Sequence, residues 1–191
     1  MKRALDLLAL AAGWALLALS ALVGFEVVAR KLFVVSVKGV DEIGGYVLAV
    51  GSAFGFIYAL TQHAHIRVDI VFKYLPPTVR ALLHLLAFVT LAAFAGVLAW
   101  HGAAVWLRSI SLDAIAPTPL GVPLVYPQGL WVFGLTVFAL LAAWMAADLL
   151  VTFLRKGGVA VDQRFHADRL EAEFKAEQLD ARRRAAAATK P

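Results

Sequence analysis

Four of the five histidines lie in or beside apolar segments, a setting in which paired imidazoles can ligate a b-type haem. These are His63, His65, His84 and His101. Their spacing argues against a haem site, because a helix rises about 25 Å between His84 and His101. His63 and His65 are two residues apart and do not share a helical face. We therefore expect no cofactor and no metal site, with a four-helix b-type cytochrome as the alternative function.

Acidic residues inside a membrane helix often mark an ion pathway. Asp6, Glu26 and Asp148 each lie within one or two turns of an expected helix end, where we expect them to reach water or headgroups. No acid falls at the middle of an apolar segment. The chain has no cysteine, and it has no phosphate-binding loop, nucleophile elbow or zinc-ligand spacing. These features predict neither an enzyme nor a transporter that works alone; conduction by the purified chain would support the latter.

Small residues recur every fourth position at Gly51, Gly55 and Ala59. This small-xxx-small spacing lets two membrane helices approach closely. We expect the face to pack either inside this chain or against a partner.

The elements that carry these residues are long apolar segments. The chain is 62% hydrophobic and 16% charged, and its apolar residues fall into four stretches of about the length that crosses a bilayer. We predict an all-α integral membrane protein with four transmembrane helices, over about 7–28, 43–60, 80–107 and 127–153, in a domain of residues 1–156. The N-terminus resembles a secretory signal, but Asp6 interrupts it and the apolar run continues to Phe25, so we expect the first helix to be retained.

Lysine and arginine near helix ends predict the orientation. One side has seven, namely Lys2, Arg3, Arg67, Lys73, Arg80, Arg155 and Lys156. The other side has four, namely Arg30, Lys31, Lys38 and Arg108. We therefore predict cytoplasmic termini. Nine of the eighteen basic residues lie in the last 37 positions beside six acids, so the net charge of +5 indicates a mixed-sign tail and no nucleic-acid partner.

The three polar connections differ in character. Residues 109–128 contain four prolines, so no regular helix can run through them, and we expect them to lie along the outer face or to dock on another protein. A short interfacial amphipathic helix is predicted to begin near Asp69. After Gly157 and Gly158, residues 157–191 form a charged cytoplasmic tail, with a helix expected over about 162–184. Deletion of the residues after Gly158 is expected to leave function intact.

Three short motifs flank the predicted spans. They are Gly39-Val40-Asp41-Glu42, His65-Ile66-Arg67-Val68-Asp69 and Thr118-Pro119-Leu120-Gly121-Val122-Pro123. With four spans in fewer than 200 residues, the chain resembles the small membrane subunit, the DctQ-like component, of a tripartite ATP-independent periplasmic (TRAP) transporter. The resemblance covers about residues 5–153 and leaves out the tail.

The resemblance implies a bacterial inner-membrane uptake system with three parts. A periplasmic binding protein captures an organic acid, typically a carboxylate, and a large multi-span subunit translocates it with sodium. The small subunit belongs to the fixed membrane scaffold. The family's substrate and sodium sites lie in the large subunit, so none is assigned to this chain.

What the resemblance carries to this chain is structural. Asp41 and Glu42 would begin the second helix at the outer face, near its positive end, and Arg30 would be the charge partner of Glu42. The alternative for each charged residue is a solvated side chain at the membrane surface. The residues expected at a subunit or headgroup interface are Arg30, Asp41, Glu42, Gly51, Gly55, His65, Arg67, Asp69, Pro119 and Pro123.

Overall fold

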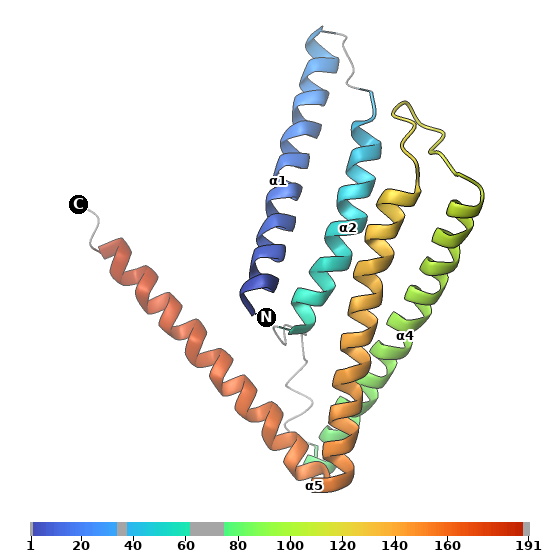
Figure 1. Cartoon of the computed structure of the whole chain (residues 1–191). Helices are drawn as coiled ribbons and strands as arrows, with labels where there is room; N and C mark the ends of the chain where they lie inside the picture. Colours follow the sequence, from blue (N-terminus) through green and yellow to red (C-terminus); the bar gives the residue numbers. More distant parts are fainter. Residues whose placement is uncertain (1, 34–37, 62–74, 189–191) are drawn as a thin grey trace. The chain divides into compact units, whose positions relative to one another are not determined.

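The computed structural model describes residues 2–33, 38–61 and 75–188, with the main chain alone at 2–6, 8–9, 164–176 and 179–188. The described residues form four helices (Figure 1). They are α1 (Lys2–Phe33), α2 (Val40–Thr61), α4 (Pro77–Ser111) and α5 (Val125–Ala188). All four are long and apolar enough to cross a membrane, which confirms the predicted all-helical class with four spans. The interfacial helix expected near Asp69 lies outside the described residues.

The starts of the helices follow from local chemistry. The carbonyl of Gly39 accepts the N–H of Ile43 at 3.0 Å where α2 begins. The first turn of α2 carries Asp41 and Glu42, whose carboxylates favour the positive end of the helix. Pro77 begins α4, where the missing N–H has no helical partner to lose. The helix therefore starts three residues before the predicted span.

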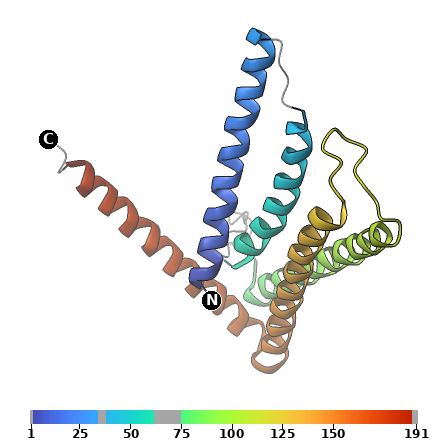
Figure 2. The same ribbon diagram turned by 45° about the horizontal axis from the view of Figure 1, so that its top comes forward.

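The chain divides into two compact units, residues 1–67 with 89–144 and residues 68–88 with 145–191. In the first unit the helices lie in the order α1, α2, α5, α4 (Figures 1 and 2). Leu19 of α1 lies against Gly44 of α2. On its other side α2 meets α5, where the Phe56 and Phe138 ring centroids are 5.6 Å apart. In the first unit α5 therefore lies between α2 and α4, so these two helices are not neighbours there.

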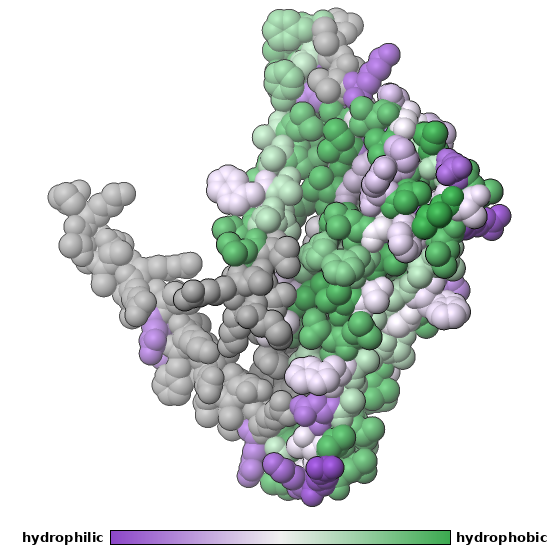
Figure 3. All heavy atoms as spheres, viewed as in Figure 1, coloured by the Kyte–Doolittle hydropathy of each residue, from purple (hydrophilic) through white to green (hydrophobic). Residues whose placement is uncertain are grey.

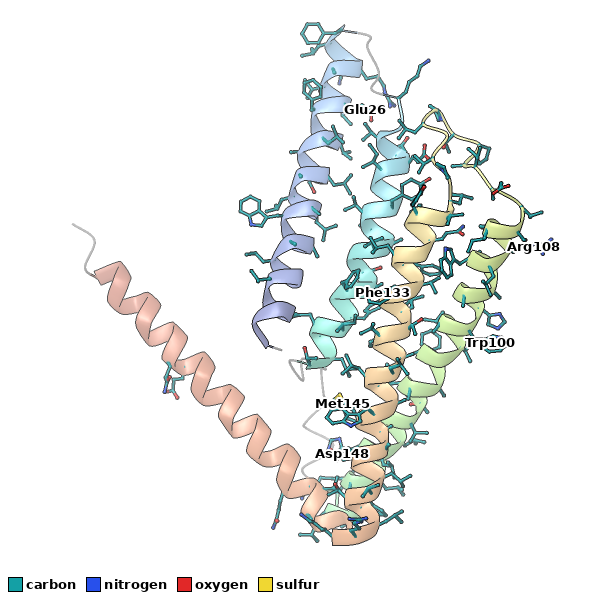
Figure 4. All side chains as sticks on the ribbon, viewed as in Figure 1. Glu26, Trp100, Arg108, Phe133, Met145 and Asp148 are labelled. Atoms are coloured by element: carbon teal, nitrogen blue, oxygen red, sulfur yellow. The ribbon has the colours of Figure 1, made fainter. Side chains whose placement is uncertain are left out.

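Large apolar side chains cover the sides of the helices (Figure 3). In the most apolar window of α1 only 6% of residues are buried, against 22% in each of the other three spans. Trp100, which is 76% exposed, points away from α5 (Figure 4). This surface suits a hydrocarbon solvent, in which apolar side chains need no protein cover.

The second unit contains the first turns of α4 together with the part of α5 that begins at Met145. Inside α5 the helix breaks at Gly157, where φ is 78° and ψ is 172°. This combination is available almost only to glycine. Beyond the break the helix continues to Ala188.

Candidate functional site

The α4–α5 connection, residues 112–124, is a hairpin. Its main chain closes through the N–H of Ala116 to the carbonyl of Val122 at 3.0 Å, and the N–H of Leu124 to the carbonyl of Ala114 at 3.0 Å. At the tip, the N–H of Gly121 donates to the carbonyl of Thr118 at 3.0 Å. The sequence predicted an irregular segment, and the prolines do exclude a helix. They still permit a hairpin, because Pro119 suits the second position of a tight turn and Gly121 takes a positive φ of 59°.

The tip of the hairpin packs on the start of α2 within the first unit. Gly39 has a φ of 89°, and a Cβ built on it would lie 2.4 Å from Cγ of Leu120. Glycine is needed here for both its conformation and its lack of a side chain. The adjacent Val40 is 1% exposed. The hairpin, which the sequence left free to lie on the outer face or to dock on another protein, is held by its own chain.

Glu42 lies where α2 meets the hairpin. The hydroxyl of Tyr46, one turn later, donates to its Oε1 at 2.7 Å. The carboxylate also interacts with the side chain of Thr118 and with the main chain at Leu120 and Val122. None of the described residues completes a hydrogen bond of ordinary geometry to Oε2, which is buried. The arrangement fixes a negative charge at the helix start and ties the hairpin to it.

Arg30 pairs with Glu26, one turn earlier on α1, rather than with Glu42 as predicted. Residues four apart share a helical face, so this pair costs little ordering of the chain. The prediction that Glu26 reaches water is also wrong, since Glu26 is only 5% exposed. Glu26 does lie two turns from the end of α1, as expected, but its side chain is covered within the fold and pairs with Arg30 (Figure 4).

The glycines of the first unit fall into packed and open positions. A Cβ at Gly134 on α5 would lie 2.9 Å from Cβ of Ala53 on α2, and Ala53 is fully buried. A Cβ at Gly51 or Gly55 would meet nothing within 4 Å in the described chain. The close α2–α5 contact therefore uses Gly134. Gly51 and Gly55 lie on the same face of α2 as Gly44, which Leu19 of α1 contacts, but the described chain leaves room for a side chain at both.

Of the remaining predicted interface residues, three lie in the described part of the chain and three do not. Asp41, Pro119 and Pro123 are exposed at the hairpin end of the first unit. Three others, His65, Arg67 and Asp69, lie outside the described residues.

The two histidines of the apolar segments that the structure describes, His84 and His101, lie in different units. His84 is buried in the second unit, and His101 is exposed in the first. Among the residues that the structure describes, no three His, Cys, Asp or Glu side chains gather as metal ligands would.

The sequence analysis did not single out two contact residues, Tyr46 and Gly134, although the spacing of Tyr46 from Glu42 pointed to its contact. Tyr46 follows Glu42 by four positions, so its hydroxyl is within reach on the same face. Gly134 carried no comparable signal in the sequence, because the need for a glycine there arises only from Ala53, which lies opposite on α2.

The model of the family described as tripartite ATP-independent periplasmic transporters, DctQ component, matches residues 19–155. The chain belongs to this family. The DctQ component is the small membrane subunit of a TRAP transporter and not an enzyme, and this membership gives the cytochrome alternative no support. Comparisons with curated proteins and with solved structures returned no match. The DctQ match covers all four predicted spans in part or whole, together with the hairpin, and ends just before Gly157.

Proposed function

We propose that this chain is a scaffold subunit that braces the large translocating subunit of a TRAP transporter. The transporter takes up an organic acid, delivered by a periplasmic binding protein, with sodium as the coupling ion. The family match carries this proposal. Support comes from the open apolar surface of α1 and from the room that the described chain leaves beside Gly51 and Gly55 on α2, which suit contact with another membrane protein.

The proposal assigns no transport step to this chain. Glu26 is neutralised by Arg30 on its own helix, and Glu42 lies in the first turn of α2 against the hairpin. A charge that is paired or held at a helix start is suited to fixing structure and not to releasing a proton or an ion during a cycle. Arg30 and Asp41 face headgroups or the large subunit, as do the exposed Pro119 and Pro123.

Copurification and reconstituted uptake test the scaffold role. A tagged form of the chain should capture a large multi-span membrane protein from the producing bacterium. Proteoliposomes should take up an organic acid along a sodium gradient only when they contain both membrane subunits and receive the binding protein. Uptake at the normal rate by the large subunit alone would contradict the bracing role.

The proposed topology places both termini in the cytoplasm and the hairpin in the periplasm. The chain has no cysteine, so single cysteines can report on each side. A membrane-impermeant maleimide should label Leu112→Cys on intact spheroplasts, and Glu177→Cys only after permeabilisation. Leu112 and Glu177 are both exposed, so differences in reactivity report sidedness. The reverse labelling pattern would show that the hairpin is cytoplasmic and the termini are periplasmic.

A further inference from the structure

The chain after the apolar part of α5 turns sharply and returns to the start of α4, all within the second unit. Gly157 supplies the break, and Gly158 lies so close to α4 that a Cβ on it would be 3.0 Å from Cα of Thr78 and 3.4 Å from Cβ of Ala81. The two glycines are needed for different reasons. Gly157 has an unusual backbone conformation in open space, and Gly158 has an ordinary one in a crowded place.

One buried side chain and one ion pair follow this turn. Val161 is fully buried, as is Ala81 on α4. Arg80 Nη2 lies 3.0 Å from Asp162 Oδ2, with 28% and 18% of the two side chains exposed. Apolar burial and a partly shielded ion pair thus act on the same short segment.

The ion pair offsets the unfavourable positive charge of Arg80 at the start of α4. Arg80 lies in the first turn of α4, where the helix presents its positive end. Its Nε is buried and has no hydrogen-bond partner among the described residues. The carboxylate of Asp162 offsets both the guanidinium charge and the helix end.

We propose that residues 157–162 are a latch that fastens the end of the fourth span to the first turns of α4. The latch lies beyond residue 155, where the family match ends. The first turn of the tail is therefore packed on the start of α4. This inference is independent of the proposed scaffold function.

Amide hydrogen exchange of the full-length chain in lipid nanodiscs tests the latch. Asp162→Asn should raise exchange of the amides at 159–163 about fivefold, because it leaves the Arg80 charge at the helix start without its partner. Glu177→Gln is the matched control, since it also removes one carboxylate from the tail but at an exposed position. Arg80→Gln should have a smaller effect than Asp162→Asn, because it also removes the unfavourable charge.

A charge-exchanged variant, Arg80→Asp with Asp162→Arg, completes the test. It should restore slow exchange, since the pair is reformed and an acid now lies at the start of α4. Equal exchange in Asp162→Asn and Glu177→Gln would overturn the latch, as would a failure of the exchanged pair to restore protection. If Asp162→Asn does not accumulate, accumulation of the exchanged pair at the normal level supports the latch, and its loss overturns it.

Discussion

Gly134 on α5 and Gly55 on α2 are the same type of residue and both lie inside an apolar helix, yet their surroundings differ. A Cβ on Gly134 would press on Ala53 at 2.9 Å, whereas a Cβ on Gly55 would meet nothing within 4 Å in the described chain. Ala53 and Gly55 are two residues apart on α2, so they lie on different faces of one helix. The described fold therefore leaves no room for a side chain at Gly134 and leaves room for one at Gly55.

The largest effect should come from filling the packed position. Gly134→Val places three carbon atoms where there is no room for one, and we expect a loss of about 3 kcal/mol or more in the free energy of unfolding. Helix propensity cannot explain such a loss, because valine is a better helix former than glycine. The midpoint of heat-induced unfolding of the detergent-purified chain measures it.

Gly55→Val is the matched control for that variant. It makes the same substitution at a position with room for a side chain, and we expect its unfolding midpoint to lie near that of the unaltered chain. If the two valine variants lose equal stability, the distinction between packed and open glycines is wrong.

A smaller loss should follow Gly39→Ala at the base of the hairpin. The positive φ of 89° costs about 1–3 kcal/mol for a residue with a side chain, and the added Cβ would also press on Leu120. Leu120→Ala in the same chain should recover only the steric part, because it does not change the backbone conformation. Full recovery would show that the conformation at Gly39 contributes nothing. Thermal unfolding of the single and double variants separates the two contributions.

A loss of about 1 kcal/mol should follow Trp106→Phe on α4. The indole Nε1 donates to the carbonyl of Val125 at 3.0 Å, and the ring lies against Gly129. Phenylalanine keeps much of the ring contact and leaves that carbonyl without this donor. A chemical-denaturation midpoint would detect the change. Trp100→Phe, at an exposed position, is the control and should have no effect.

The smallest effect on stability, and the largest on assembly, should come from Gly51→Leu with Gly55→Leu. We expect the isolated chain to change by less than about 0.5 kcal/mol, because both sites are open. The proposed contact with the large subunit should be lost, since two leucines prevent close approach of a helix. Pull-down of the large subunit measures this. Normal binding by this variant would show that the large subunit contacts a part of the chain other than Gly51 and Gly55.

Much of the fold could be predicted from residue types. Hydropathy and length gave four helices, because lipid offers no partners to an open backbone. The predicted starts near 80 and 127 lie three and two residues after the observed starts at Pro77 and Val125. Each helix has a proline in its first turn, Pro77 or Pro127, where a proline permits a helix to begin. The charge pairs were less predictable. The sequence offered Arg30 two acidic partners, Glu26 on the same helix and Glu42 at the start of the next. The observed pair is the local one, with Glu26 four residues earlier on α1.

The sequence by itself determined that the chain has four helices long and apolar enough to span a membrane, that a proline-rich connection lies between the last two, and that the chain belongs to the DctQ family. These properties depend on composition and local spacing. Only the tertiary structure decided that α5 lies between α2 and α4, that Gly134 and not Gly55 is the packed glycine, and that Asp162 returns to Arg80. The physical reason is that contact between helices depends on which faces meet, and the same small residue is suited to a packed face or an open one.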